Sequence, residues 1–170
     1  KCAGGRDTLS LWNLGADEVI GVDISPRMQD LAARLTAATG APARWIECDV
    51  LDTPHELDGT ADLVYTGRGS IIWIQDLDAW AAVLHRLLAP SGRLVIFDGH
   101  PAEWLFDADV DGHWIATDYD YFGGPEASKG WAPEYIDHLS IAEDDQSWKF
   151  ARAWTLGEIV TALLAAGLKL

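Results

Sequence analysis

The sequence predicts an α/β fold with a doubly wound, mostly parallel sheet, and three observations support this. Short apolar segments alternate with helical patterns along the chain, which is typical of parallel βαβ units. A small-residue turn over residues 2–8 opens the first helical pattern. Two neighbouring apolar segments each end in an acid, Asp23 and Asp49. Ligands of open α/β sheets bind outside the carboxyl ends of the strands, so these features are expected to form one site.

The elements of the first half follow from periodicity and from signals at helix ends. Ser25 can cap a helix with Pro26 at its first position, and Gly40 ends it. The apolar side of this helix is expected at Met28, Leu31, Ala32 and Leu35, spaced three and four apart. The predicted elements are, in order, a helix over 7–14, a strand over 18–22, a helix over 26–39 and a strand over 43–48.

The second half continues the alternation with a strand over 62–66, a helix from Asp78 and a strand over 93–97. The inner face of the helix is expected at Trp80, Ala81, Leu84 and Leu88. The strand over 93–97 is nearly all apolar, which predicts cover on both faces. Thr155 and Glu158 form a capping box for a last helix. That helix is expected to bury Leu156, Ile159, Val160, Leu163 and Leu164.

Residues 99–154 break the pattern. This stretch is rich in aromatic and turn residues, and a loop of this length inside a domain is usually functional or disordered. The many aromatics argue against disorder. The expectation is an insertion that covers the carboxyl ends of the strands, and the alternative is a flap that packs its aromatics on the core.

Composition excludes several classes of partner. The chain has 170 residues and a net charge of −15 at pH 7, with no basic stripe for nucleic acid. No apolar run is long enough for a membrane span, and two cysteines without metal-ligand spacing predict no metal and a cytoplasmic protein. Twelve acids lie between Glu103 and Asp145, where Lys129 is the only base. They form either a solvated surface or a mouth that attracts a neutral or cationic substrate.

The turn over residues 2–8 and the two acids at strand ends, Asp23 and Asp49, occur here in a fixed order. In this respect the chain resembles the class I S-adenosylmethionine-dependent methyltransferases. The closer likeness is to a small-molecule branch whose first motif reads Cys-x-x-Gly-x-Asp-Thr-Leu-Ser-Leu, matched by Cys2, Gly5, Asp7 and the segment 8–11. These enzymes usually carry glycine near Ala3. The likeness continues through the segments 21–26, 62–66, 92–95, 100–101 and 156–160.

The resemblance implies a Rossmann-like fold, S-adenosyl-L-methionine as cofactor and methyl transfer to a small-molecule substrate. It also implies that residues 1–170 form a single methyltransferase domain, with the insertion over 99–154 after its fifth strand. A first strand is expected ahead of Lys1 and a further strand after Leu170, so the domain is expected to be incomplete at both ends. The oligomeric state and the acceptor stay open.

The expected cofactor site begins at the glycine turn. Gly4 and Gly5 would let main chain lie against the methionine part of the cofactor, or they form an ordinary tight turn. Asp7 would orient that turn or cap its helix. Asp23 would accept hydrogen bonds from both ribose hydroxyls, and its alternative is a solvated acid at a strand end. By resemblance, Ile24 stacks beside the adenine.

The rest of the expected cofactor site lies on the following strands. Asp49 would accept a hydrogen bond from the adenine amino group, with a cap or turn residue as the alternative. The amide of Val50 would meet a ring nitrogen of the adenine. Thr66 and Gly67 would line the side of the methyl donor.

Methyl transfer mainly requires orientation, and a general base helps only where the nucleophile must lose a proton. His100 is the candidate base or substrate contact, and its alternative is a histidine that bonds loop backbone. His113, His138 and Tyr119 are weaker candidates. The related enzymes often carry a histidine where this chain has Trp154.

Two other functions are alternatives to methyl transfer. A nicotinamide-dependent oxidoreductase would need a Gly-x-Gly-x-x-Gly turn, which residues 3–8 do not provide, and a Tyr-x-x-x-Lys pair, which is also missing. A cofactor-binding module without catalysis is the second alternative.

Overall fold

The computed structural model describes residues 1–109, 111–130, 142 and 145–170. The chain divides into two compact units. Unit 1 consists of residues 1–66, 78–97 and 163–170, and unit 2 of residues 67–77 and 98–162. Each unit is described by itself.

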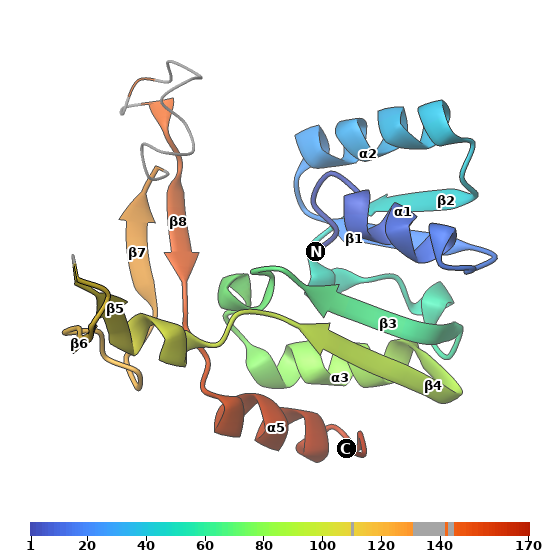
Figure 1. The fold of residues 1–170 in the computed structure, drawn as a ribbon. Helices are drawn as coiled ribbons and strands as arrows, with labels where there is room; N and C mark the ends of the chain where they lie inside the picture. The colour runs from blue at the N-terminus through green and yellow to red at the C-terminus, as the bar shows by residue number, and fades with distance from the viewer. Residues whose placement is uncertain (110, 131–141, 143–144) are drawn as a thin grey trace. The chain divides into compact units, whose positions relative to one another are not determined.

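The first half of unit 1 is a parallel strand pair with two helices. β1 (Val19–Asp23) pairs with β2 (Ala43–Glu47), so that Val19 lies opposite Ala43 and Asp23 opposite Glu47. α1 (Arg6–Asn13) packs against β1, and α2 (Pro26–Thr39) packs against both strands (Figure 1). The four elements expected for the first half are therefore confirmed within one or two residues.

α2 begins and ends as its sequence predicts, but its packed face differs from the predicted one. The Ser25 hydroxyl accepts a hydrogen bond from the Met28 amide, and Gly40 takes the left-handed conformation at φ 70°. Ala32 is fully buried, whereas Met28 and Leu31 are 39% and 43% exposed. Gln29 is buried instead, because its side-chain amide donates to the carbonyls of Asp23 and Ile46.

The second half of unit 1 contains the pair β3 (Ala61–Gly67) and β4 (Leu88–Phe97), with α3 (Leu77–Leu87) between them in sequence. The two arrows point the same way in Figure 1. Of the predicted inner face of α3, Trp80, Ala81 and Leu84 are buried. Leu88 lies outside the helix, because α3 ends at Leu87 and β4 begins at Leu88.

One expectation about the sheet was wrong for the described residues. Val95 and Phe97 are 44% and 67% exposed, so β4 is not covered on both faces. These side chains lie two apart and therefore share one face of the strand. The described strands of unit 1 form two hydrogen-bonded pairs, β1 with β2 and β3 with β4.

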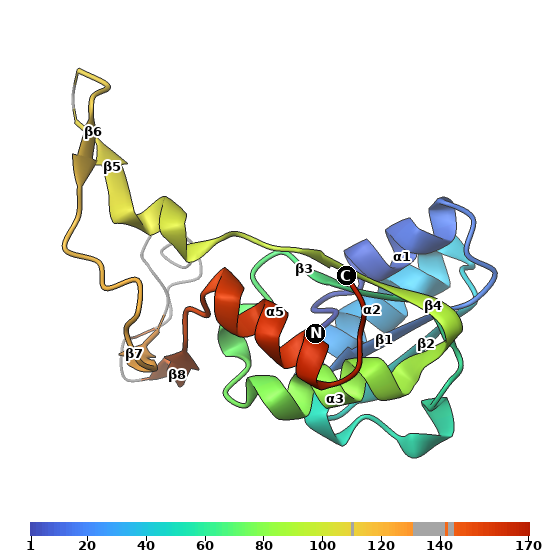
Figure 2. The same cartoon turned by 90° about the horizontal axis from the view of Figure 1, so that it is seen from below.

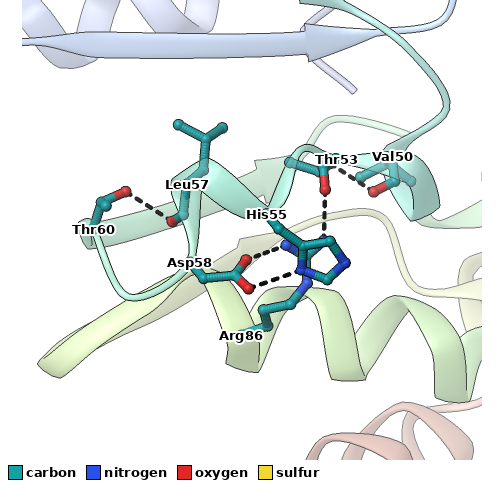
Figure 3. A network of polar contacts seen from close by, with 7 residues as sticks. All are labelled: Val50, Thr53, His55, Leu57, Asp58, Thr60 and Arg86. Atoms are coloured by element: carbon teal, nitrogen blue, oxygen red, sulfur yellow. Dashed lines mark hydrogen bonds and ion pairs between the residues drawn. The ribbon is translucent and has the colours of Figure 1, made fainter.

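The link between β2 and β3 is fastened to α3 by a polar network (Figure 3). It runs through the short helices η1 (Val50–Asp52) and η2 (His55–Leu57). The Asp58 carboxylate accepts from Arg86 and lies 2.9 Å from His55 Nδ1. Arg86 also donates to the carbonyl of Thr53, which is 2% exposed, at 2.7 Å.

The pKa of Asp58 reflects this network. Partial desolvation raises the pKa of this carboxyl group. The hydrogen bonds from His55 and Arg86 lower it by a larger amount, so the pKa of Asp58 lies below its ordinary value. The stabilisation that Asp58 contributes is therefore present above the ordinary carboxylate pKa and is lost as the pH falls through the lowered value.

Unit 2 contains two antiparallel ribbons and short helices. β5 (Phe106–Ala108) pairs with β6 (Trp114–Ala116), and β7 (Glu126–Lys129) pairs with β8 (Trp148–Ala151). Figures 1 and 2 show them as separate ribbons. The short helices η3 (Ile71–Trp73) and η4 (Pro101–Leu105) complete this part of the unit.

α5 (Leu156–Ala165) follows the ribbons and begins with the predicted capping box. The Thr155 amide donates to Glu158 at 2.9 Å, and the Glu158 amide donates to the Thr155 hydroxyl at 3.2 Å. Ala162 and Leu163 are buried, but Leu156 and Leu164 are 58% and 49% exposed, against expectation. The helix is apolar on several sides, so its periodicity alone did not select the packed face.

Within the described ranges, no helix has the length and hydropathy that a bilayer crossing requires. The same residues contain no cluster of three or more metal-ligating side chains.

Replacing Arg86 by methionine in the full-length protein tests the network. Without the guanidinium, the buried Thr53 carbonyl has lost the Arg86 donor, and the free energy of unfolding is expected to fall by about 1–3 kcal/mol. Arg44→Met is the matched control, because the Arg44–Glu56 pair is 50% and 68% exposed and is expected to contribute under about 1 kcal/mol. Urea unfolding measures both variants, and equal losses would contradict the anchoring role of Arg86.

Candidate functional site

The candidate site in unit 1 starts at the turn that precedes α1. The Gly5 amide donates to the Cys2 carbonyl at 2.9 Å and closes the turn. Ala3 and Gly5 have φ values of 44° and 80°, a left-handed conformation that favours glycine. Ala3 therefore occupies a position where glycine would be unstrained, which gives a physical reason for the glycine common near this position in the resembling enzymes.

The indole of Trp45 lies directly against this turn. A Cβ on Gly5 would lie 2.5 Å from Trp45 Cη2 and 2.9 Å from the Ala32 Cβ, and a Cβ on Gly21 would also overlap the ring. The Trp45 Nε1 donates to the Thr36 hydroxyl at 2.9 Å, which fixes the ring in place. Gly4 is less constrained, because a Cβ there would meet only the flexible end of Leu31.

Asp23 fastens the turn to the carboxyl end of β1. Its Oδ2 accepts from the Ala3 amide at 2.8 Å, and its Oδ1 accepts from the Ser25 amide at 3.0 Å. Asp23 is only 8% exposed, so it is not the solvated acid that was the alternative. Each carboxylate oxygen can accept a second hydrogen bond, which leaves capacity for two ligand hydroxyls.

Asp49 and Val50 lie at the end of β2. Asp49 is exposed and caps η1, with its Oδ1 accepting from the Leu51 amide at 2.9 Å. The capping role left open by the sequence is therefore present, and it uses one carboxylate oxygen. The pKa of the Lys1 side chain lies below its ordinary value, because desolvation lowers it more than the charges of Asp23 and Asp49 raise it.

The other predicted cofactor residues occupy the expected ends of elements. Ile24 follows Asp23 and is 57% exposed, so one face is open for stacking. Asp7 lies in the first turn of α1. Thr66 is buried near the end of β3, in unit 1, and Gly67 begins unit 2. Their contacts with a cofactor stay predictions.

Asp98, in unit 2, is a backbone-bonded acid that the sequence did not single out. Its carboxylate accepts from the amides of Gly69, Ser70 and Ile71 and from Gly99. Arg68 and Gly69 take left-handed conformations, which turns successive amides toward this acid. Asp98 comes directly after the apolar strand β4, much as Asp23 closes β1. An acid at the end of an apolar strand was therefore the sequence signal for Asp98.

His100 bonds loop backbone and an aromatic hydroxyl, both within unit 2. Its Nδ1 accepts from the Ala102 amide at 3.2 Å, and its Nε2 lies 3.2 Å from the Tyr121 hydroxyl. In a neutral ring the proton is then on Nε2, which donates to Tyr121. The backbone-bonding alternative is therefore present, and catalysis by His100 stays a prediction.

The other candidate bases differ in their surroundings. His113 pairs with Asp109 on an exposed loop, with Nδ1 3.2 Å from the carboxylate. Tyr119 is half-buried beside Trp104. His138 lies outside the described residues.

Comparisons with known proteins agree with this geometry. Residues 1–92 match the family model described as "Methyltransferase domain", which is more than half of the chain, and the chain belongs to this family. A curated relative, the demethylmenaquinone methyltransferase of Thermus thermophilus, is 37% identical over 84 residues. The match covers 49% of this chain and 37% of that protein, so the chain spans well under half of that relative's length.

Solved structures establish the fold. An S-adenosylmethionine-dependent methyltransferase from Mesorhizobium loti matches with a TM-score of 0.69 and 21% identity, over 99% of this chain and 71% of that one. Geranyl diphosphate C-methyltransferase from Streptomyces coelicolor matches with a TM-score of 0.61 and 16% identity, over 97% and 50%. The Rossmann-like α/β fold of class I methyltransferases is therefore confirmed, and the oxidoreductase alternative loses its support.

Gly5→Ala tests the contact between the turn and Trp45. Left-handed strain and overlap with the ring both oppose the new Cβ, whereas Gly40→Ala at φ 70° meets open space and carries the strain alone. We expect the Gly5 variant to lose about 1–3 kcal/mol more unfolding free energy than the control. Chemical denaturation of the full-length variants measures this, and equal losses would show that Trp45 does not confine the turn.

Nitrogen chemical shifts of the histidine rings test the bonding of His100. Above the pH of ring titration, His100 is expected to carry its proton on Nε2, since Nδ1 accepts a backbone amide. His113 is the internal control and should carry its proton on Nδ1, because a carboxylate can only accept. A proton on Nδ1 of His100 would refute the assignment.

Proposed function

We propose that the protein transfers the methyl group of S-adenosyl-L-methionine to a small-molecule acceptor. The observation that carries the proposal is the buried Asp23 carboxylate, which closes β1 and holds the glycine turn by the Ala3 amide. Membership of the methyltransferase domain family supports the choice of cofactor.

The residues present in unit 1 suit this cofactor. Gly4 and Gly5 carry no Cβ, so their main chain would lie close to the methionine part. Asp23 would bind the ribose hydroxyls with its remaining lone pairs. Ile24 would stack on the adenine, and Asp49 and Val50 would bind its polar edge. Thr66, at the end of unit 1, would line the side of the methyl donor.

When bound, the cofactor supplies a methyl group already activated on a sulfonium. The protein therefore has to position a nucleophile in line with that methyl group and keep water out, and orientation of this kind is worth roughly 7–11 kcal/mol. An acceptor that must lose a proton needs a base nearby. The His100–Tyr121 pair is the candidate, because two titratable groups share one hydrogen bond there.

The acceptor is proposed to be a small molecule. Curated and structural relatives are named for demethylmenaquinone and geranyl diphosphate, which are different compounds, so they support the size class of the acceptor only. The acidic charge supports the absence of a nucleic-acid partner. A cytoplasmic location is part of the proposal and is supported by Cys2 and Cys48, which form no disulfide with each other.

Binding of S-adenosylhomocysteine to full-length variants tests the cofactor site. Asp23→Asn is expected to weaken binding about tenfold or more, because hydrogen bonds to a charged group contribute about 1.5–3 kcal/mol. Asp49→Ala should weaken binding by a smaller factor, because Asp49 is exposed, and should lower the melting temperature slightly, because the variant loses the cap on η1. Asp30→Asn, an exposed acid on α2, is the control.

Calorimetry gives the affinities and circular dichroism the melting temperatures. Unchanged affinity in both Asp23→Asn and Asp49→Ala would overturn the cofactor site. The Asp49 variant keeps the test decisive if Asp23→Asn does not fold.

A further inference from the structure

Unit 2 contains a hollow of about 180 Å³ with aromatic and acidic walls. Trp104 and Tyr119 form two of its sides, and Asp120 and Glu126 lie on its lining. At roughly 30 Å³ for each water molecule, the volume equals about six waters, which suits a small head group rather than a whole cofactor.

The two aromatic walls meet nearly at a right angle. Their ring centroids are 5.4 Å apart and the planes cross at 81°. Such a corner presents electron-rich ring surface to a guest, which attracts organic cations more strongly than neutral groups of equal shape.

The corner is held by Thr117, which does not line the hollow itself. Its hydroxyl donates to the Trp104 carbonyl at 2.6 Å and accepts from the Tyr119 amide at 3.2 Å. One side chain therefore fixes the backbone of both aromatic residues. The opposite wall is fixed as well, because the Arg152 amide donates to the Ile72 carbonyl at 2.8 Å between Ala151 and Ala153.

The electrostatic character of the hollow is negative. Among the residues that the structure describes, its lining includes two carboxylates and no lysine, arginine or histidine. The pKa of Tyr119 is raised, first by desolvation and then by Glu126 and Asp120, which shows that both acids act on this wall. Asp120 is also held in a turn, where its Oδ1 accepts from the Phe122 amide at 3.0 Å.

From the aromatic corner and its two carboxylates, we infer that this hollow binds the substituted ammonium group of a small organic cation. The inference rests on the proposed function in naming that cation as the acceptor, and it deepens the proposal from any small molecule to an amine-bearing one. An ammonium nitrogen has no lone pair, so the methyl group would go to another atom of the molecule, or to the amine after it has lost its proton. The two acids among the lining residues would then be ligand contacts rather than a solvated surface.

Choline and its neutral carbon isostere, 3,3-dimethylbutan-1-ol, are the probes, and calorimetry on the full-length protein measures both. Choline is expected to bind at least about tenfold more tightly, because the two molecules differ mainly in charge. Equal affinity for the two, or no binding of choline, would overturn the inference. This comparison uses the unaltered protein, so it does not depend on the folding of any variant.

Three variants locate the site. Trp104→Leu and Glu126→Gln are each expected to weaken choline binding roughly three- to thirtyfold. Glu103→Gln removes the same charge from a residue that does not line the hollow, and its affinity should change less than twofold. If Glu103→Gln weakens binding as much as Glu126→Gln, net charge rather than the hollow attracts the cation.

Measurements with S-adenosylhomocysteine separate this inference from the proposed function. Cofactor binding without choline binding would refute the hollow as an ammonium site and leave methyl transfer standing. Choline binding without cofactor binding would refute the proposed function, and the cation would then be a ligand of another kind.

Discussion

The carboxylate of Asp23 is the constraint on which the candidate cofactor site depends. It accepts an amide from Ala3, twenty residues earlier, and an amide from Ser25, two residues later. The turn before α1 and the start of α2 are therefore fixed at the same strand end. Gln29 adds to this by donating to the carbonyls of Asp23 and Ile46, which joins the ends of β1 and β2. A buried acid that satisfies several amides costs little in desolvation, since each oxygen has a donor.

Helix ends were predictable from the sequence because their chemistry is local. Ser25 with Pro26 begins α2, Gly40 ends it, and Thr155 with Glu158 begins α5. Each of these signals acts within four residues of a helix end, and all three lie where they were expected. Packed faces were less predictable. Met28, Leu156 and Phe97 are exposed although their spacing indicated burial, because periodicity shows that a side is apolar but not which neighbour covers it.

The candidate site was predictable in the positions of its acids but not in their partners. The ends of the predicted strands indicated Asp23 and Asp49. No sequence pattern indicated the backbone amides that donate hydrogen bonds to these acids. Asp98 was missed because its donors lie 27–29 residues away, in a loop whose left-handed residues turn the amides toward it. His100 was found by resemblance, but its ring bonds depend on Tyr121, 21 residues further along the chain. Hydrogen bonds between distant segments require the fold.

These carboxylates show how an acidic protein can keep defined sites. Asp23, Asp49 and Asp98 each accept backbone amides, so their positions are set by main chain rather than by flexible cations. The Cys2 amide bonds the Val22 carbonyl on the edge of β1 that faces away from β2, so the same strand end is also organised from its other side. Asp23 and Asp49 keep free lone pairs at known places, whereas four amide donors occupy the carboxylate of Asp98.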